Sequence, residues 1–240
     1  MSNAAGNEQG IGAPVRRRED QRFITGQGQY TDDINQPRQT YAVFCRSPFA
    51  RTAITGIDAS EALAVEGVLA VYTGADMVAD GLGDLPCGWM VKSKDGADMQ
   101  SAPHPPMAAT VANYAGEPYA LVVAESLQAA RQGAESVQAG FDELHAVVDL
   151  SQATVSESIY EGIDRNVAYQ WALGDEDATR MAFARAAHVT TVDLTNNRLI
   201  PNALEPRACM GVYEAGSGDY TLYTTSQNPH LERLVLSAFV

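Results

Sequence analysis

Residues 117–149 read EPYALVVAESLQAARQGAESVQAGFDELHAVVD, and this stretch decides the fold. Its first part, residues 119–124 (YALVVA), is a short apolar run of the kind that forms a buried strand. Ser126 can then cap a helix. Apolar residues follow at steps of three or four, along one helical face: Leu127, Ala130, Ala134, Val137 and Phe141. Residues 145–149 (HAVVD) predict the next strand, so the stretch predicts a strand, a helix and a strand in succession.

A second pair of elements precedes this stretch, in residues 57–77 (IDASEALAVEGVLAVYTGADM). Asp58 and Glu61 have the spacing of a capping box for a short helix. Gly67 is placed where such a helix would end. Residues 68–73 (VLAVYT) then predict a strand.

The rest of the first 150 residues contains one more clear strand and two irregular segments. Residues 40–47 (TYAVFCRS) predict a mostly apolar, buried strand that Pro48 would end. Residues 17–34 mix charges with two glycines, a pattern of loops or short strands. Residues 84–110 carry four prolines without a clean period, and a long loop of this kind is either functional or disordered. We therefore expect a compact domain of mixed helices and strands.

A second pattern follows a polar junction. Residues 175–186 (DEDATRMAFARA) predict a helix, and residues 188–197 (HVTTVDLTNN) predict an alternating strand. Residues 206–226 (PRACMGVYEAGSGDYTLYTTS) predict a β-hairpin whose turn lies at residues 216–219.

The last predicted helix begins with Asn228 as N-cap and Pro229 in its first position. Its apolar face consists of Leu231, Leu234, Val235, Ala238 and Phe239. No glycine, asparagine or basic residue closes this helix before Val240, which favours a polypeptide that continues.

The charge of the chain is strongly negative and uneven. The net charge is −14 over 240 residues, which argues against nucleic acid as a partner because phosphates require clustered cations. Residues 1–51 differ from the rest, with seven arginines, five acidic residues and a net charge of +2. This basic arm is either a docking segment for an acidic surface or a solvated tail.

Cysteine spacing and hydropathy limit the class of protein further. The three cysteines Cys45, Cys87 and Cys209 are far apart, so we expect neither an iron–sulfur cluster nor a structural zinc ion within this chain. Lone cysteines fit reduced surroundings, and residues 1–14 lack the apolar core of a signal peptide. We therefore expect a cytoplasmic protein without a membrane span.

Polar residues between a strand and a helix form the main candidate site, in residues 224–230 (TTSQNPH). Ser226 and Gln227 precede the helix start, where backbone N–H groups and neutral amides can receive a polar group. The alternative is that Asn228 caps the helix and Gln227 only hydrogen-bonds the loop.

Other polar residues give weaker signals. Residues 197–208 (NRLIPNALEPRA) contain Glu205 and Arg207, and Glu117 precedes a proline at a strand entrance, where a turn or a hydrogen bond between domains is the commoner role. The four histidines show no metal-ligand spacing, which leaves a metal-dependent hydrolase poorly supported.

At these residues the sequence resembles the large, molybdenum-cofactor-binding subunit of the molybdenum hydroxylases: the relatives of xanthine dehydrogenase, aldehyde oxidase and aerobic carbon monoxide dehydrogenase. Six segments carry the resemblance, in an order and spacing that are highly specific: RREDQRFITGQGQYTDDI, VFCRSPFARTAITGIDASEAL, GVLAVYTGADM, GEPYALVVAESLQAA, NNRLIPNALEPRA and YTTSQNPH. The resemblance is strongest to the carbon monoxide dehydrogenase-like subunits.

The resemblance implies an α+β fold in two domains. Residues 20–150 would form an α/β hammerhead domain after a flexible arm of residues 1–19. A linker of residues 151–164 would lead to the beginning of the molybdenum-cofactor-binding domain, residues 165–240.

The resemblance also implies an activity, cofactors and site residues. The reaction would be the oxidative hydroxylation of a small molecule, namely an aldehyde, an N-heterocycle or carbon monoxide. Electrons would pass to iron–sulfur clusters and FAD on partner subunits. Gln227 would lie beside the apical oxygen of the molybdenum–molybdopterin cofactor with Ser226 next to it, and Glu205 and Arg207 would lie near the substrate pocket.

The sequence departs from the family pattern in three respects. It lacks the family's glycine-rich cofactor loop, the glutamate that serves as catalytic base, and the active-site loop that separates carbon monoxide oxidisers from other hydroxylases. We therefore expect the 240-residue chain to be inert alone and to work with the remainder of the large subunit. The alternative hypothesis is a stand-alone, non-catalytic hammerhead-type interaction or scaffold module.

Overall fold

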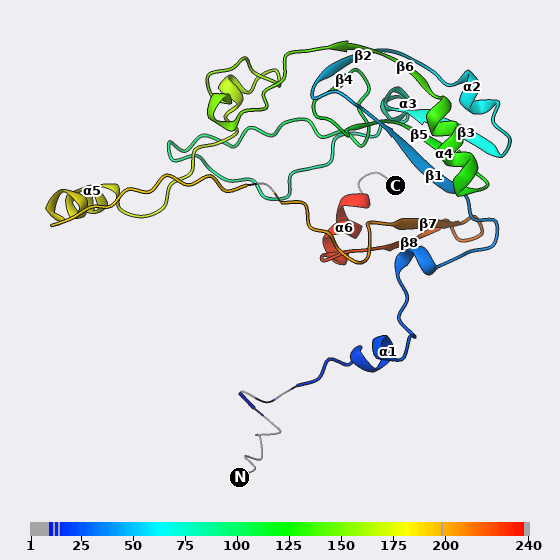
Figure 1. Ribbon diagram of the computed structural model, residues 1–240, viewed down its shortest axis with the longest axis horizontal. Helices are drawn as coiled ribbons and strands as arrows, with labels where there is room; N and C mark the ends of the chain where they lie inside the picture. The colour runs from blue at the N-terminus through cyan, green and yellow to red at the C-terminus, as the bar shows by residue number, and fades with distance from the viewer. Residues whose placement is uncertain (1–9, 12, 14, 198, 238–240) are drawn as a thin grey trace. The chain divides into compact units, whose positions relative to one another are not determined.

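The computed structural model describes residues 10, 11, 13, 15–197 and 199–237, and it divides by contacts into two compact units. The larger unit consists of residues 38–197 and 228–240, and the smaller one of residues 1–37 and 198–227. Figure 1 labels their helices and strands. Among the described residues, every helix is too short or too polar to cross a membrane.

The larger unit contains most of the secondary structure (Figure 1). Its strands are β1 (Tyr41–Arg46), β2 (Thr52–Asp58), β3 (Val68–Thr73), β4 (Val111–Ala112), β5 (Pro118–Ala124) and β6 (Gln138–Glu143). Its helices are α2 (Ser60–Leu63), α3 (Gly74–Ala79), α4 (Leu127–Ser136), α5 (Glu176–Arg185) and α6 (Pro229–Leu236), with 3-10 turns η2 (Leu150–Gln152) and η3 (Asp164–Asn166).

Two antiparallel sheets organise this unit. Strand β5 lies between β1 and β3, and strand β2 lies between β4 and β6. The middle strand β5 supplies Ala120, Val122 and Ala124, all fully buried on one face of the strand. The predicted strands of residues 40–47, 68–73 and 119–124 are thus confirmed, and together they form one sheet.

Helix α4 packs against β1 and β5, and its sequence explains both its start and its close approach. The Ser126 hydroxyl accepts a hydrogen bond from the Ala129 N–H at 3.1 Å, which confirms the predicted cap. At Gly133 an added Cβ would lie 2.8 Å from Val68 and 2.9 Å from Val122. The helix therefore needs glycine at this position to rest on the sheet.

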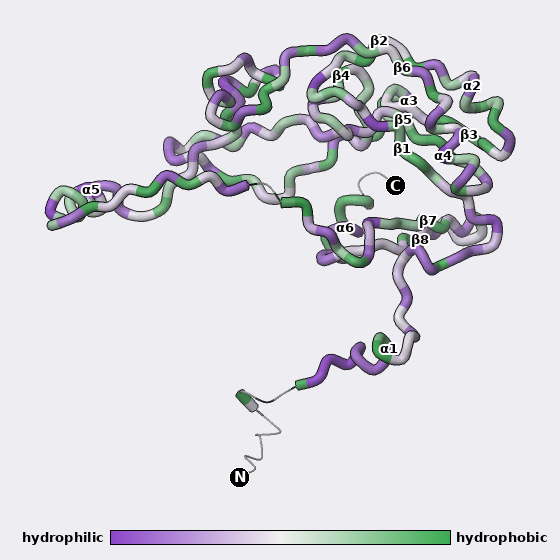
Figure 2. The backbone as a smooth tube through the Cα atoms, viewed as in Figure 1, coloured by the Kyte–Doolittle hydropathy of each residue, from purple (hydrophilic) through white to green (hydrophobic). Residues whose placement is uncertain are grey.

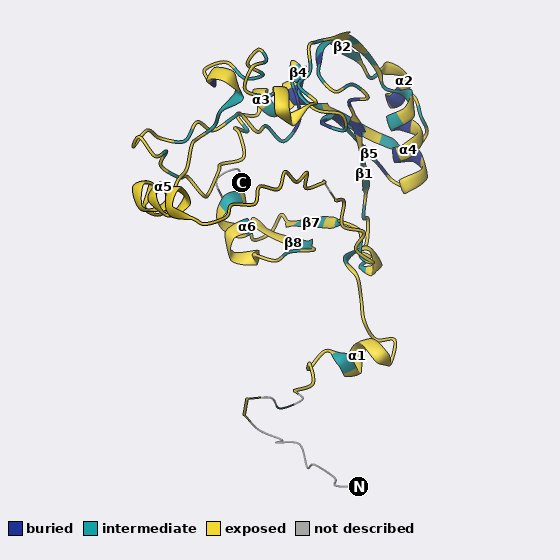
Figure 3. Cartoon of the chain, turned by 60° about the vertical axis from the view of Figure 1, so that its left-hand side comes forward, coloured by how far each residue is buried: buried dark blue, intermediate teal, exposed yellow. Residues whose placement is uncertain are grey.

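The core joins the two sheets through aromatic contacts. The ring of Tyr119 on β5 meets the ring of Phe141 on β6 edge to face, with centroids 5.4 Å apart. The ring of Phe49 also packs against the ring of Phe141, with centroids 5.6 Å apart. Figure 3 shows the buried residues gathered around β5 and α4, whereas α5 is exposed all round.

The helix predicted in residues 127–141 is shorter in the structure. Helix α4 ends at Ser136, and Val137 already has extended backbone angles (φ −68°, ψ 122°). Phe141 therefore lies on strand β6, from which it packs against the core. Its spacing of four residues from Val137 also fits the alternation of a strand, so this spacing alone did not distinguish a helix from a strand. The strand predicted for residues 145–149 is wrong, because the strand lies earlier, at Gln138–Glu143.

Three further expectations need correction. Residues 188–197, a predicted strand, have no regular secondary structure. Residues 17–34 contain helical turns where loops or short strands were expected. Asp58 accepts a hydrogen bond from the Ser60 N–H at 2.9 Å and makes no capping box with Glu61, since α2 begins at Ser60 and Ala59 is its N-cap.

Several local signals are confirmed in the structure, and one is wrong. The predicted helix stop at Gly67 is wrong, because α2 already ends at Leu63 with Ala64 as its C-cap, although Gly67 has a positive φ of 87° in the turn that leads into β3. Residues 84–110 are largely irregular, and α5 occupies the predicted helical segment. Helix α6 starts at Pro229 with Asn228 as N-cap, whereas Ala238, Phe239 and Val240 of its predicted apolar face lie outside the described residues.

The smaller unit combines the N-terminal segment with a hairpin. It contains α1 (Asp20–Ile24), the 3-10 turn η1 (Thr31–Asp33), β7 (Cys209–Glu214) and β8 (Asp219–Thr224). Figure 2 shows a hydrophilic run that leads into α1, which corresponds to the arginines and acids of residues 16–22. The predicted hairpin is confirmed, and β7 packs against η1.

Candidate functional site

The β7–β8 hairpin delivers two of the candidate residues. Its turn closes with Gly218, which has a φ of 78° and donates its N–H to the Glu214 carbonyl at 2.8 Å. The strands pair from Glu214 and Asp219 at the turn to Cys209 and Thr224 at the other end. Ser226 and Gln227 leave this open end directly after β8.

The other two candidate residues enter the hairpin at the same end. Arg207 lies two residues and Glu205 four residues before Cys209, the first residue of β7. Because Cys209 pairs with Thr224, the approach to β7 and the exit from β8 flank one end of the antiparallel pair. The topology thus places the four predicted residues on the two chain segments that flank this end of the hairpin, although 22 positions of sequence separate Glu205 from Gln227.

The four side chains differ in exposure and contacts. Gln227 and Arg207 are exposed, whereas Ser226 and Glu205 are half-buried. The Glu205 carboxylate accepts a hydrogen bond at 2.9 Å from the backbone N–H of Thr31, the first residue of η1. No local pattern could have indicated this contact, because its two residues lie 174 positions apart.

The chemistry of this edge is that of hydrogen-bond donors. Gln227 offers an amide, Ser226 a hydroxyl and Arg207 a guanidinium. Within the described part of the chain, no group of three or more histidine, cysteine or acidic side chains is arranged to hold a metal ion. The edge can therefore receive a cofactor or a substrate through hydrogen bonds, and these residues do not form a metal-ligand set.

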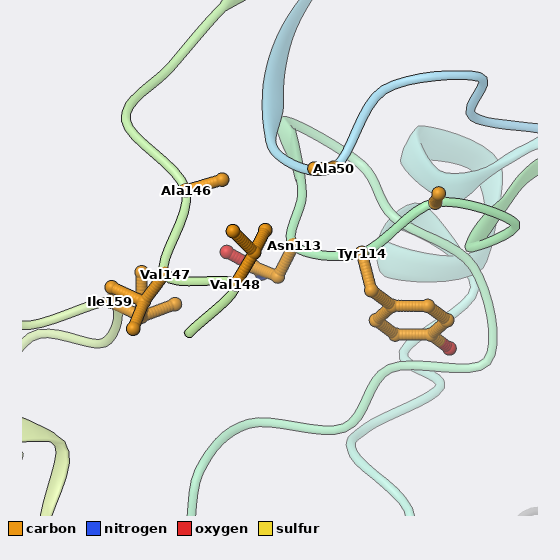
Figure 4. A pocket seen from close by; sticks show the side chains of 8 residues that line it. Ala50, Asn113, Tyr114, Ala146, Val147, Val148 and Ile159 are labelled. Carbon is orange, nitrogen blue, oxygen red and sulfur yellow. The ribbon is translucent and has the colours of Figure 1, made fainter. Parts of the chain in front are cut away.

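A separate depression lies in the larger unit and was not predicted (Figure 4). Its cavity of about 300 Å³ is lined by Ala50, Asn113, Tyr114, Ala115, Ala146, Val147, Val148 and Ile159. Mostly aliphatic residues line it, together with Asn113 and Tyr114, and they come from four segments that are distant in the sequence, so no local motif could have indicated it. Figure 4 shows the Tyr114 ring turned away from the two valines.

Arg51 and Glu117 hold the loops around this depression. The Arg51 guanidinium donates to Asn113 Oδ1 at 3.3 Å and to the carbonyls of His145 at 3.3 Å and Ile159 at 3.0 Å. Glu117 is only 6% exposed and accepts a hydrogen bond from the Asn113 N–H. The bond joins residues four positions apart within the larger unit, so Glu117 has the expected role in a turn and this bond is not the expected hydrogen bond between domains.

Two tyrosines near Glu117 titrate above their ordinary range. Burial, and then the negative charge of Glu117, raise the pKa of Tyr114 and the pKa of Tyr160. Arg46 acts in the opposite direction on Tyr114, and Arg51 does so on Tyr160. Both phenols are therefore neutral hydrogen-bonding groups at physiological pH.

Two family descriptions match consecutive parts of the chain. The aldehyde oxidase and xanthine dehydrogenase a/b hammerhead domain matches residues 25–145. The molybdopterin cofactor-binding domain matches residues 159–240, which include all four candidate residues.

Individual proteins show the same similarity over almost the whole chain. The nicotine 6-hydroxylase large subunit of Paenarthrobacter nicotinovorans is 33% identical over 96% of this chain and 28% of its own length. The carbon monoxide dehydrogenase large chain of Afipia carboxidovorans is 30% identical over 95% of this chain and 29% of its own.

A solved structure agrees with the sequence comparisons. Quinoline 2-oxidoreductase from Pseudomonas putida 86 superposes with a TM-score of 0.78 at 29% identity, over 98% of this chain and 29% of that one. The chain thus spans less than a third of the length of these relatives. The chain belongs to the family of xanthine dehydrogenase, aldehyde oxidase and carbon monoxide dehydrogenase large subunits, and it carries their hammerhead domain and the start of their molybdopterin cofactor-binding domain.

Proposed function

We propose that this chain provides the N-terminal part of a molybdenum hydroxylase large subunit, which oxidatively hydroxylates a small molecule. The observation that carries the proposal is the succession of the two family domains within one chain. Relatives named for nicotine, carbon monoxide and quinoline support a small substrate, either an N-heterocycle, an aldehyde or carbon monoxide. The domain boundaries expected from the sequence, residues 20–150 and 165–240, belong to this proposal.

The open end of the hairpin fits the cofactor by the chemistry of its donors. A molybdopterin cofactor, when bound, supplies the two-electron oxidation of the substrate. Toward it the chain directs the exposed amide of Gln227 and the neighbouring hydroxyl of Ser226. Neutral donors suit a group with oxygen acceptors, since they need no counter-charge and impose little desolvation cost compared with a buried ion.

Gln227 stabilises negative charge in this proposal. With a molybdopterin cofactor bound at this edge, the side-chain amide of Gln227 would donate a hydrogen bond to it, and such a bond would be stronger to a more negatively charged acceptor. A donor placed where charge develops lowers the barrier by about 3 kcal/mol. Arg207 and Glu205 are the charged residues of the same edge, and Arg207 has the exposed guanidinium that could orient a polar substrate.

The chain acts with partners. The remainder of the large subunit supplies the parts of the site that this sequence lacks, and iron–sulfur and flavin subunits accept the electrons. The isolated chain is accordingly expected to show no substrate-dependent dye reduction. A cytoplasmic location fits the free thiols of Cys45, Cys87 and Cys209.

Exchange of Gln227 tests this assignment. Gln227→Glu keeps the size of the side chain but removes both N–H donors. In the assembled complex we expect kcat to fall about a hundred- to a thousandfold at unchanged molybdenum content.

The matched control is Gln128→Glu, the same change at an exposed position of α4. It is expected to leave kcat within about twofold, because surface substitutions of this kind have small effects. Equal turnover of the two variants would contradict the role of Gln227.

A further inference from the structure

The N-terminal segment belongs to the same compact unit as the hairpin that carries Gln227. Residues 1–37 and 198–227 form this unit, although residue 38 already leads into β1 of the larger one. Turn η1 packs against strand β7. The N-terminal segment is therefore structurally part of the cofactor-binding edge, despite its distance from it in sequence.

One charge-assisted hydrogen bond joins the two parts. The Thr31 N–H is one of the donors that a helical turn leaves without a partner at its start. Glu205 Oε1 accepts this hydrogen bond at 2.9 Å, and both residues are half-buried. The Tyr30 N–H donates a separate hydrogen bond to the Asp33 carboxylate at 2.9 Å, so the start of η1 is also held by a bond within its own segment.

The position of Glu205 connects this bond to the candidate site. Glu205 lies four residues before Cys209, and Cys209 pairs with Thr224. Gln227 follows Thr224 by three residues. Fixing Glu205 against η1 thus fixes the chain at the end of the hairpin from which Gln227 emerges.

We propose that Glu205 is a positioning residue, whose carboxylate fastens the N-terminal segment to the hairpin and thereby holds the loop of Gln227 in place. This inference rests on the proposed function in so far as Gln227 serves the cofactor. It assigns Glu205 to the support of the site and not to contact with substrate. The segment around η1 becomes a brace for the cofactor-binding domain.

Thr31 allows the bond to be removed without any change to Glu205. Thr31→Pro deletes the backbone donor, and proline is tolerated in the first position of a helical turn. The preceding residue, Tyr30, already has the extended angles that proline requires (φ −88°, ψ 163°). Thr31→Ala is the matched control, since it changes the side chain but keeps the N–H.

The first readout is hydrogen exchange in the assembled complex, which does not depend on turnover. We expect Thr31→Pro and Glu205→Ala each to accelerate exchange in residues 209–227 about tenfold, because each removes a hydrogen bond to a charged group. Thr31→Ala should match the wild type, and Glu205→Gln, which keeps an acceptor oxygen, should restore most of the protection. Unchanged exchange in both disrupting variants would overturn the proposal.

The second readout is turnover. Thr31→Pro and Glu205→Ala should lower kcat by a similar factor, about tenfold, because small displacements of a catalytic group are costly. Their combination should cost no more than either alone. A large loss in Glu205→Ala with wild-type turnover in Thr31→Pro would show that Glu205 acts on the substrate, and would overturn the proposal.

The background of Gln227→Glu separates this proposal from the proposed function. There Glu205→Ala should cause no further loss of kcat if it acts through Gln227, while the exchange effect in residues 209–227 should remain. Failure of the proposed function would appear as normal turnover in Gln227→Glu itself. Additive losses of kcat in the double variant would overturn the positioning role.

Discussion

The β5–α4 region and the β7–β8 hairpin are built in opposite ways. Val122 of β5 is fully buried, and α4 covers the sheet so closely that Gly133 leaves no room for a methyl group. Tyr220 of the hairpin is 64% exposed, and most other hairpin side chains are also exposed. A two-stranded hairpin is only marginally stable by itself. The buried core therefore lies in the first region, and the residues that we propose contact the cofactor lie next to the second.

The two regions also differ in the range of the contacts that hold them. Ser126 caps α4 from the adjacent residue, so the contact is encoded locally. The hairpin is braced by Glu205 through a bond to Thr31 across 174 positions. The Ser126 cap depends only on neighbouring residues, whereas the Glu205–Thr31 bond depends on the position of a distant segment of the chain.

The largest expected difference between the two regions is in the free energy of unfolding that is lost when a side chain is shortened. Val122→Ala should lower the free energy of unfolding by about 2–3 kcal/mol, because it removes two buried methyl groups and leaves a cavity. Leu222→Ala on the exposed hairpin should cost less than about 1 kcal/mol. Urea unfolding followed by circular dichroism measures both, and equal losses would contradict the contrast between the regions.

Adding a methyl group at a tightly packed glycine and at an open one tests the same difference in packing. Gly133→Ala should destabilise the protein by about 1–2 kcal/mol, since the strain of overpacking exceeds the gain in helix propensity. Gly211→Ala on β7 is the matched control, because its added Cβ meets no atom within 4 Å. A stabilised Gly133→Ala variant would mean that α4 can move away from the sheet.

The smallest expected effect concerns alkaline pH. Burial, then the charges of Glu117 and Tyr114, raise the pKa of Tyr160 above its ordinary value of 10.0. The folded state therefore retains this proton longer than the unfolded state, and the associated stability is complete below pH 10.0 and lost as pH rises through the folded pKa.

Replacement of the phenol isolates this contribution. Tyr160→Phe should reduce the loss of unfolding free energy between about pH 9 and pH 11, because it removes the titrating group. Tyr72→Phe, a change at an exposed tyrosine of β3, is the control. Parallel stability profiles for Tyr160→Phe and the wild type would contradict the contribution of Tyr160.

Most of the larger unit could be predicted because its signals are local. The apolar run of β5 and the cap at Ser126 each act within a few residues. Phe141 was assigned to the helix because its spacing fits both periods, and only the extended backbone at Val137 decides between them. Alternation in residues 188–197 failed as a strand signal, since a strand also requires a pairing partner that no local pattern supplies.

Only part of the candidate site could be predicted from the sequence. Ser226 and Gln227 were proposed because a strand, polar residues and a helix start follow one another and resemble a known motif, and their role stays a prediction. The Glu205–Thr31 bond and the depression beside Asn113 join distant segments through backbone groups and small apolar side chains, which leave no mark in a local pattern.

The most direct test of the central claim is the intact mass and molybdenum content of the native polypeptide that carries this sequence, purified from its source cells. The account expects a mass far above 25.7 kDa and about one molybdenum per polypeptide. A polypeptide of 25.7 kDa purified without molybdenum would contradict it, and would favour the non-catalytic hammerhead-type module instead.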